Sequence, residues 1–364
     1  MNLFRLAKST GEGRIFRAEA ALFPDYLPEE LPGREREVRE LVYCLQPASE
    51  NRQPFHALLI GPPGTGKTSS AKFVLKHLSE YSKRPLPVYV NCWESQSRFA
   101  VLSALALALE EPMPRRGIAA DEIFSRIVEI GRKEGRIPIV VLDEVDRLAG
   151  EADGTQVLYD LCRAGEAHSL KTGVIAITND AEFHLQLDPR IRSSFVQHTL
   201  SFGAYTVPQL KEILSTRAAA AFLPCALEED VVPLCAAIAF KQGGDARVAL
   251  SLLYSAGKAA ERGGAQSVSV GHVRAIEGAA LASSSVKAER KLPEMDEVDQ
   301  RIVSAVKEAG KKGLESGKLY AKLSKHSGER AVRARVDRLI GNGILKAEAL
   351  NLGTGRSRLL RIKE

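Results

Sequence analysis

The chain has 364 residues, of which 45% are hydrophobic and 26% are charged, as in ordinary globular proteins. Its length exceeds what one hydrophobic core usually organises, so we expect two or three domains. The longest apolar run, Ala100 to Leu109, is too short for the roughly 18–20 residues of a membrane span, and no signal peptide is apparent. The five cysteines form no C-x-x-C pair and lie in apolar stretches, which predicts buried, reduced thiols. These features exclude membrane channels and secreted disulfide scaffolds, and they favour a cytoplasmic protein.

The positive charge of the chain is concentrated at its C-terminal end. The formal net charge is +6. Residues 295–364 hold 16 Lys and Arg against 9 Asp and Glu, whereas the rest of the chain holds 35 against 36. A basic terminal module on a neutral body indicates that this module binds a polyanion such as nucleic acid.

The first 35 residues are predicted to contain little regular structure. Residues 1–22 show no strong periodicity, and we expect an extended arm or a short helix there. Three prolines in nine residues, Pro24, Pro28 and Pro32, then hold the segment 23–35 extended. A helix over 35–46 and an apolar strand over 56–60 are expected next.

A glycine-rich loop follows this strand and precedes a helix predicted over 69–79. Its residues fit the pattern G-x-x-x-x-G-K-[ST] of a phosphate loop: Gly61, Pro62, Pro63, Gly64, Thr65, Gly66, Lys67 and Thr68. Glycines let successive N–H groups point inward as an anion nest, and the helix adds the positive end of its dipole. We expect Lys67 to reach the β- and γ-phosphates of a nucleotide and Thr68 to ligate Mg²⁺. The alternative is a glycine turn that binds nothing.

The extended segment 23–35 stands just before this loop in the chain. A rigid apolar strip at that place would form one wall of an adenine pocket. The alternative interpretation is a strap that only packs across the core.

Strands and helices alternate after the loop, which predicts a doubly wound parallel sheet in an α/β fold. We expect strands over 86–91, 137–142, 173–178 and 196–202, and helices over 98–110, 121–132 (with Asp121 as N-cap) and 154–164. From residue 205 to about 281 only helical periodicity remains, in the stretches 208–221, 228–240, 244–260 and 270–281. This predicts a small all-helical domain.

Polar side chains follow two of the predicted strands. Asp143 and Glu144 end the strand 137–142, which places both carboxylates at the sheet edge where ligands of parallel sheets bind. Asp143 is the candidate for holding Mg²⁺, and Glu144 is the candidate for polarising an attacking water. Asn179 follows the next strand and would position that water, unless it merely turns the chain.

One arginine of the helical domain is a candidate for phosphate binding. Arg247 lies on the first turn of the helix 244–260, where it could reach bound phosphates across an interdomain cleft. A plain surface arginine is the alternative.

The C-terminal module is predicted to be a winged helix-turn-helix. We expect helices over 296–309, 316–325 and 328–342, then strands over 344–349 and 358–362 joined by a glycine-rich tip. Candidate DNA contacts are the arginines of the third helix and of the hairpin: Arg330, Arg333, Arg335, Arg356 and Arg358. A winged helix used for protein contact is the alternative, and the +7 charge favours DNA.

Together these motifs resemble the AAA+ superfamily and, within it, the archaeal origin-recognition initiators, relatives of the eukaryotic ORC and Cdc proteins. Beyond the phosphate loop the resemblance rests on Leu31-Pro32-Gly33-Arg34-Glu35, Tyr89-Val90-Asn91-Cys92 and Gly244-Asp245-Ala246-Arg247. It implies an AAA+ ATP-binding core over 1–203 with an N-terminal arm over 1–22. A helical lid over 204–284 and a winged-helix DNA-binding domain over 295–364 would follow.

The resemblance implies a DNA replication initiator that binds origin duplex DNA and uses ATP binding and slow hydrolysis as a conformational switch. Lys67 and Thr68 would be Walker A, Asp143 and Glu144 Walker B, Asn179 sensor 1 and Arg247 sensor 2. With ATP or ADP and Mg²⁺ as cofactors, the implied nucleotide contacts are Tyr26, Leu31, Pro32, Arg34, the loop from Gly61 to Thr68, Ser69, Asp143, Tyr205 and Arg247. The implied partners are double-stranded origin DNA, the replicative helicase and other copies of the initiator.

Three points are left open by the motifs. In initiators an extra helix touches DNA, and by position this implicates Trp93 to Phe99, with Arg98 its only basic residue. Eukaryotic relatives often have Arg where Ser194 stands, so Arg190 or Arg192 would have to act as an arginine finger in trans, or there is none. A DNA motor or remodeller, such as a branch-migration ATPase, is the alternative function.

Overall fold

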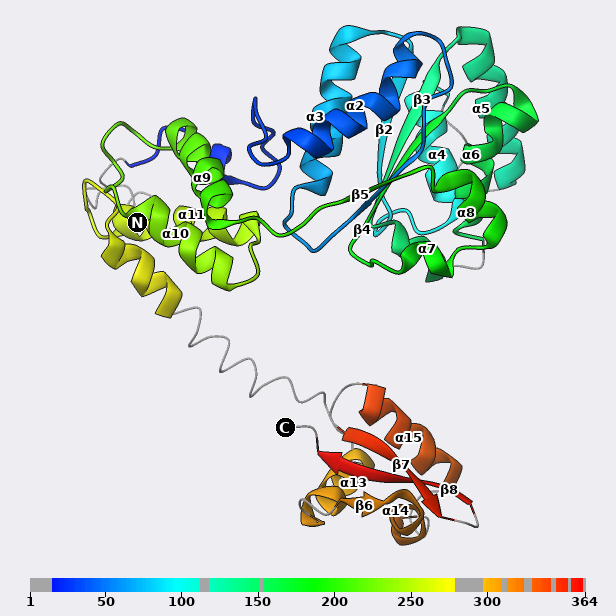
Figure 1. Cartoon of the computed structure of the whole chain (residues 1–364), viewed down its shortest axis with the longest axis vertical. Coiled ribbons are helices and arrows are strands. Elements are labelled where there is room, and N and C mark those ends of the chain that lie inside the picture. Colours follow the sequence, from blue (N-terminus) through cyan, green and yellow to red (C-terminus); the bar gives the residue numbers. More distant parts are fainter. Residues whose placement is uncertain are drawn as a thin grey trace, which may run out of the picture. The chain divides into compact units, whose positions relative to one another are not determined.

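The computed structural model describes residues 15–111, 118–150, 153–278, 297–309, 313–323, 329–341, 345–352 and 355–362. The chain divides into two compact units, Met1–Gly278 and Ala279–Glu364, which are described separately (Figure 1). None of the described helices combines the length and the apolar character that a membrane span requires.

The first unit is built on a five-stranded parallel sheet. Its strands are β1 (Ala57–Ile60), β2 (Pro85–Asn91), β3 (Ile137–Asp143), β4 (Gly173–Thr178) and β5 (His198–Ser201), in the order β2-β3-β4-β1-β5. Every residue of β3 and of β4 is buried, because a parallel sheet is covered on both faces. The predicted doubly wound α/β sheet is therefore confirmed.

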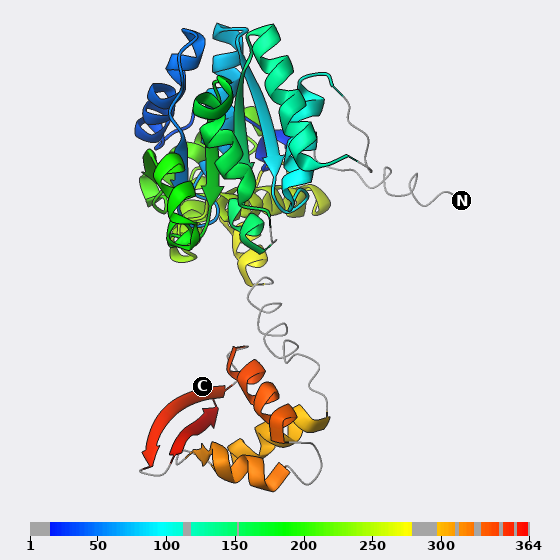
Figure 2. The same ribbon diagram turned by 90° about the vertical axis from the view of Figure 1, so that its right-hand side faces the viewer.

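Helices cover both faces of this sheet (Figure 2). The helices α2 (Glu35–Ser49) and α3 (Lys67–Tyr81) pack on one face; α4 (Arg98–Ala108), α5 (Ala120–Glu134), α6 (Gln156–His168) and α8 (Pro189–Phe195) pack on the other. The side chains of β3 alternate between the two faces of the sheet. Ile139 and Val141 pack with α2 and α3, whereas Val140 and Leu142 pack with the helices of the opposite face. The carboxyl end of β3 thus emerges between two fully packed layers.

Several short elements differ from the sequence prediction. The 3₁₀ helix η2 (Val145–Gly150) and the helices α7 (Phe183–Gln186) and α8 were not expected, since four to seven residues carry too little periodicity. Asp121 is not the N-cap of α5, because Ala119 holds that position and Asp121 lies in the first turn. The prediction of uniformly buried cysteines is wrong for Cys225, which is exposed.

The lid is a helical domain within the same unit. It comprises α9 (Val207–Ala221), α10 (Val231–Lys241), α11 (Ala246–Arg262) and the helical residues 270–278. Its hydrophobic cluster also contains Ile15, Phe16 and Leu22, and the 3₁₀ helix η1 (Glu19–Leu22) packs on α9 and α11. Residues 15–22 therefore pack with the lid, although their sequence position suggested an arm of the core.

The second unit contains three helices and a small antiparallel sheet. Its elements are α13 (Glu297–Glu308), β6 (Leu314–Glu315), α14 (Ser316–Leu323), α15 (Glu329–Gly341), β7 (Leu345–Leu352) and β8 (Gly355–Ile362), with strand order β6-β8-β7. Val332, Val336 and Leu339 of α15 are buried against Ile302 and Leu360. These are the elements of a winged helix-turn-helix, and only the two-residue strand β6 was not expected.

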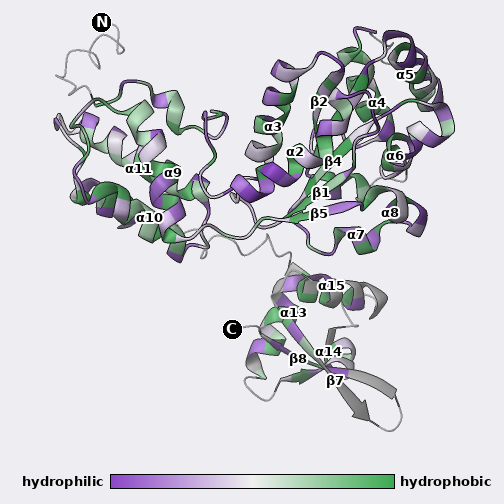
Figure 3. Ribbon diagram, turned by 45° about the horizontal axis from the view of Figure 1, so that its top comes forward, coloured by the Kyte–Doolittle hydropathy of each residue, from purple (hydrophilic) through white to green (hydrophobic). Residues whose placement is uncertain are grey.

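Hydrophobic residues gather along the strands of the five-stranded sheet in the first unit (Figure 3), and the second unit has a cluster of buried residues around Ile302 and Leu360. Each unit therefore has a hydrophobic cluster of its own. This agrees with the expectation of more than one domain from the chain length.

A glycine of α11 allows close packing of the N-terminal segment on the lid. A methyl group added at Gly257 would collide with the ring of Phe16 and press on the ring of Phe222. We expect Gly257→Ala to destabilise the first unit by about 1–3 kcal/mol, because both rings are confined. In the control Gly278→Ala the methyl group meets no atom, and stability should stay equal or rise by up to about 1 kcal/mol. Calorimetric unfolding of the full chain measures the stability of both variants. An unfolding midpoint of Gly257→Ala equal to that of the wild type would contradict the packing argument.

Candidate nucleotide-binding site

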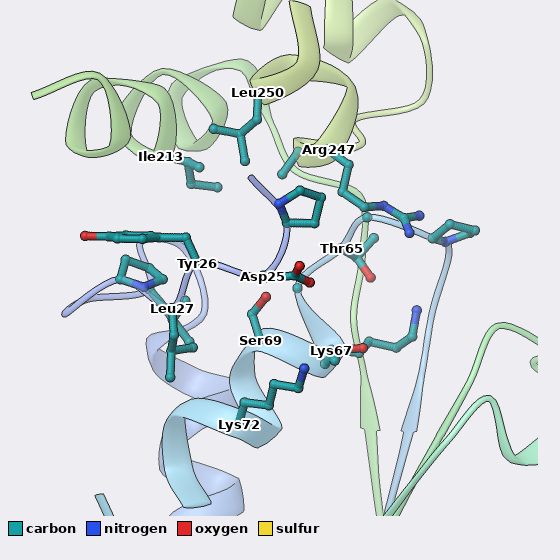
Figure 4. A pocket seen from close by; sticks show the side chains of 18 of the residues that line it. Asp25, Tyr26, Leu27, Thr65, Lys67, Ser69, Lys72, Ile213, Arg247 and Leu250 are labelled. Atoms are coloured by element: carbon teal, nitrogen blue, oxygen red, sulfur yellow. The ribbon is translucent and has the colours of Figure 1, made fainter. Parts of the chain in front are cut away.

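A cavity of about 310 Å³ lies where the phosphate loop, the N-terminal strap and the lid meet. We call the segment Phe23–Pro32, which links η1 to α2, the strap. The core contributes the phosphate loop and the ends of β3 and β4, and the lid contributes Ile213, Arg217, Arg247 and Leu250 (Figure 4). The predicted site residues that line the cavity are Tyr26, Leu31, Pro32, Pro63, Gly64, Thr65, Gly66, Lys67, Thr68, Ser69, Asp143, Glu144, Asn179, Tyr205 and Arg247.

Two glycines of the phosphate loop adopt a backbone conformation that other residues rarely adopt. Gly64 has φ +70° and Gly66 has φ +87°, both in the left-handed region. Each also receives a close neighbour: the Asp245 carboxylate lies against Gly64, and the Tyr205 hydroxyl lies against Gly66. Glycine is therefore required here both by the backbone conformation and by the lack of space.

The ammonium group of Lys67 is held by neutral acceptors. Nζ donates to the carbonyl oxygens of Gly61 (2.6 Å) and Pro62 (2.8 Å) and to Oδ1 of Asn179 (2.9 Å). Burial lowers the pKa of Lys67 to about 8, an effect that Asp143 opposes and Arg247 reinforces. Bound phosphates would supply the negative charge that these acceptors lack, and they would raise this pKa.

The Asp143 carboxylate accepts hydrogen bonds from α3, from β2 and from the residue that follows it in the chain. Its Oδ2 accepts hydrogen bonds from the hydroxyls of Thr68 (2.7 Å) and Tyr89 (2.7 Å), and its Oδ1 accepts the Glu144 amide (3.0 Å). The Thr68 hydroxyl and the Asp143 carboxylate are the hard oxygen ligands that Mg²⁺ prefers. The described residues contain no group of three His, Cys, Asp or Glu side chains able to hold a metal alone. The pair therefore fits Mg²⁺, for which phosphate and water oxygens would have to supply the remaining ligands.

Tyr89 is a site residue that sequence reasoning missed. It lies at the carboxyl end of β2, lines the cavity, and has the ammonium group of Lys72 at 4.4 Å from its ring centre. Burial and the hydrogen bond to Asp143 raise the pKa of Tyr89. The sequence did contain a signal for Tyr89. It stands in the predicted strand two residues before Asn91, which pairs with Asp143 in the sheet.

Glu144 adopts a left-handed backbone conformation with φ +57°. A non-glycine residue in this region costs of order 1–3 kcal/mol, and such residues cluster at functional sites. Burial, Asp143 and Asp146 raise the pKa of the Glu144 carboxyl. Asp146 lies within η2 and accepts a hydrogen bond from the hydroxyl of Thr178 (2.8 Å).

The lid touches the phosphate loop through the start of α11. Asp245 caps this helix by accepting the Arg247 amide (2.7 Å), and the Ala246 amide donates to the carbonyl oxygen of Gly64 (3.1 Å). The Arg247 guanidinium lies 3.4 Å from Oδ2 of Asp245, and its side chain is 54% exposed at the cavity. Arg247 thus lines the cavity next to the phosphate loop, in the position that the sequence motif predicted.

Arg34 does not line the cavity, contrary to the prediction that it contacts nucleotide. Its guanidinium is buried, donates to the carbonyl oxygens of Thr65 (2.8 Å) and Gly203 (2.5 Å), and stacks on Tyr205. Because its donors are used by backbone carbonyls and by the Glu37 carboxylate (3.4 Å), Arg34 braces the phosphate loop from outside the cavity. Gly61 and Pro62 likewise act through the carbonyls that hold Lys67.

The geometry of Arg98 does not support the predicted DNA contact. Its guanidinium is 13% exposed and pairs with Asp160 (2.6 Å) and with Asp121 (2.6 Å). Two carboxylates neutralise it, so it joins α4 to α5 and α6 rather than facing solvent. In the same region Trp93 is exposed and stacks on the guanidinium of Arg147 at 3.7 Å.

The other candidate arginines whose side chains are described are exposed or partly exposed. Arg190 and Arg192 are exposed on α8 and do not line the cavity. In the second unit Arg333 is exposed beside the ring of Tyr320, and Arg335 pairs with Asp299 at 3.4 Å. The Arg358 amide donates to Ser316 (3.1 Å). The side chains of Arg330 and Arg356 lie outside the described part of the structure.

Family models and relatives identify the chain. An AAA domain matches residues 51–184, and a Cdc6 AAA+ ATPase-type lid domain matches residues 211–277. The ORC1-type DNA replication protein 1 of Sulfurisphaera tokodaii is 36% identical over 359 residues, 96% of this chain and 90% of that protein. The chain belongs to the ORC1-type DNA replication proteins. The resemblance to AAA+ initiators is confirmed, and membership makes the chain an AAA+ ATPase.

Solved structures agree with this family. The ORC1 protein of Aeropyrum pernix, solved in complex with DNA, is 35% identical, with a TM-score of 0.73 over 96% of this chain and 94% of that one. The RuvB Holliday junction branch migration motor of Thermotoga maritima is 20% identical, with a TM-score of 0.50 over 90% of this chain and 93% of that one. This second likeness shows a shared fold alone.

The pKa of Lys67 predicts how nucleotide affinity depends on pH. The bound phosphates raise a pKa that is about 8 in the free protein, so binding favours the protonated lysine. ATP affinity should therefore be highest below about pH 8 and fall by up to about tenfold per pH unit above it. Lys67→Arg should bind with little pH dependence from about pH 7 to about pH 10, because a guanidinium stays charged. Equilibrium titration with a fluorescent nucleotide measures both, and a flat wild-type profile would contradict the assignment.

Proposed function

We propose that this protein is a DNA replication initiator that binds origin duplex DNA and uses ATP binding and slow hydrolysis as a conformational switch. The observation that carries this proposal is the likeness, over 96% of the chain, to an ORC1 protein solved with DNA. The geometry of the cavity and the charge of the C-terminal unit support the two halves of the proposal.

The ATP half follows from the residues around the cavity. The amides of the phosphate loop and the Lys67 ammonium would bind the phosphates, with Thr68 and Asp143 holding Mg²⁺. When bound, Mg²⁺ supplies charge neutralisation on the phosphate oxygens. Glu144 would polarise the attacking water, a role that its raised pKa favours. Asn179 would orient that water, since its amide already reaches Lys67 at 2.9 Å.

The switch follows from the contact between lid and phosphate loop. The Ala246 amide and the Asp245 carboxylate contact Gly64. A change in the conformation of the phosphate loop would therefore move the start of α11. Arg247 stands on that helix with a largely exposed guanidinium that would bind the γ-phosphate. Loss of this phosphate on hydrolysis would release the arginine and relax the lid.

The DNA half is assigned to the basic C-terminal unit. We propose Arg330, Arg333, Arg335, Arg356 and Arg358 as DNA contacts, with Arg333 the most exposed of those whose side chains are described. Their unit carries the whole excess charge of the chain, and phosphate neutralisation dominates affinity for duplex DNA. The neutralised guanidinium of Arg98 is not part of this proposal.

Further partners follow from the initiator role. The replicative helicase and other copies of the chain are proposed partners, and the exposed Arg190 or Arg192 could act in trans on a neighbouring nucleotide. A DNA motor or branch-migration ATPase is the second candidate, but the likeness to RuvB is one of fold alone.

Glu144→Gln is expected to bind ATP with an affinity near that of the wild type and to hydrolyse it at least about a hundredfold more slowly. The amide keeps the shape of the side chain and its hydrogen-bonding length but cannot polarise water. Phosphate release under single-turnover conditions and nucleotide titration measure the two quantities. Wild-type turnover in this variant would move the water-polarising role to another residue.

The proposed function is tested by footprinting the full chain on its own genome at fixed salt, with ATP and with ADP. We expect a few protected sites that differ in strength between the two nucleotides. Arg333→Ala should weaken the specific sites by about 1–3 kcal/mol if this side chain contacts a base. Arg132→Ala, an exposed arginine of α5 in the core, is the matched control and should leave them unchanged.

The opposite outcome is equally definite. Uniform, sequence-independent binding together with ATP-driven branch migration of a four-way junction would show a motor rather than an initiator.

A further inference from the structure

Arg217 is a buried arginine whose hydrogen-bond acceptors are all backbone carbonyls. It lies on α9 and is 7% exposed. Its Nη1 donates to the carbonyl of Tyr26 (3.0 Å), its Nη2 to that of Phe23 (2.6 Å), and its Nε to that of Ala21. Among residues 15–278 as described, no carboxylate forms an ion pair with it, and burial lowers its pKa. Burying a cation without a counter-ion is costly, so the three carbonyls must be held in one definite conformation.

These carbonyls belong to the segment that walls the cavity. The strap lines the cavity along most of its length, and the Arg217 guanidinium lies 4.6 Å from the ring centre of Tyr26. In Figure 4 the Tyr26 ring and the Lys67 ammonium lie on opposite sides of the cavity. Since Lys67 marks the phosphate side, Tyr26 and the strap mark the side left for the base.

The other end of the strap is held by the core. Arg34 follows the strap and donates to the carbonyls of Thr65 and Gly203. The strap therefore spans from the lid, at Arg217, to the phosphate loop, at Arg34. The base side of the cavity is walled by the strap, which Arg217 holds to the lid, whereas the phosphate side is formed by the phosphate loop of the core together with Arg247 of the lid.

We propose that Arg217 is a positioning residue that fastens the base-binding wall of the nucleotide site to the lid. The inference rests on the proposed nucleotide function of the cavity. Recognition of the base depends on Arg217, and recognition of the phosphates does not. A movement of the lid then carries the strap with it and opens or closes the base side of the site.

The test compares ATP with inorganic tripolyphosphate, which has no base, in calorimetric titrations of the full-length protein. Arg217→Met keeps the length of the side chain and removes its charge and its donors. We expect ATP affinity to fall at least about tenfold and tripolyphosphate affinity to stay within about twofold, because only the base wall is released.

Lys258→Met is the matched control. Lys258 also ties the N-terminal segment to the lid, through Glu19 at 2.8 Å, and neither residue lines the cavity. Its replacement should leave the affinities for both ligands within about twofold of the wild type. The deciding quantity is therefore the ratio of ATP to tripolyphosphate affinity in Arg217→Met relative to the same ratio in Lys258→Met, because the control reports what a general loosening of the N-terminal segment on the lid does to both ligands.

Each outcome decides the proposal. An equal loss of affinity for both ligands in Arg217→Met, or an unchanged ATP affinity, overturns it. If Arg217→Met does not fold, Arg217→Lys decides: one ammonium cannot reach all three carbonyls, so an intermediate loss for ATP alone supports the proposal and wild-type ATP affinity overturns it. A wild-type protein that binds neither ligand would refute the nucleotide function of the cavity instead.

Discussion

The lid and the phosphate loop meet at one glycine, and the geometry of the cavity depends on this contact. Gly64 accepts the Ala246 amide and has the Asp245 carboxylate against its Cα. A side chain at Gly64 would push Asp245 away, and with it the N-terminus of α11 and Arg247. The glycines of the loop thus serve the approach of the lid as well as the curl of the backbone.

The junction between core and lid is built around the same loop. Tyr205 donates its amide to Gly244 of the lid, places its hydroxyl against Gly66, and carries the guanidinium of Arg34 on its ring at 4.0 Å. One residue therefore touches the phosphate loop, the lid and the start of α2. Tyr205 is therefore a residue through which a change at the phosphate loop would reach the lid.

The polar side chains at the carboxyl edge of the sheet are held in place by hydrogen bonds between elements. The Asp143 carboxylate accepts hydrogen bonds from the hydroxyls of Thr68 in α3 and Tyr89 in β2. These bonds hold the start of α3 and the end of β2 to the end of β3. Lys67 reaches from the phosphate loop to Asn179 at the end of β4. The candidate catalytic groups at the ends of β3 and β4 are positioned by strands that are buried along their whole length, which restricts their movement.

The sheet, the lid helices and the polar groups at the carboxyl edge of the sheet could be predicted from the amino-acid pattern, because long periodic segments and the phosphate-loop spacing are local signals. The roles of groups whose partners are distant in the chain became visible in the fold alone. Arg34 and Arg98 are both arginines at positions that suggested a ligand contact. The guanidinium of Arg34 instead donates to carbonyls 31 and 169 residues away. The guanidinium of Arg98 is neutralised by carboxylates 23 and 62 residues away. The importance of Tyr89 and of Arg217 comes from partners that lie far away in the chain, namely Asp143 for the first and the strap for the second. Burial and pairing are properties of the folded chain, and a local pattern contains neither.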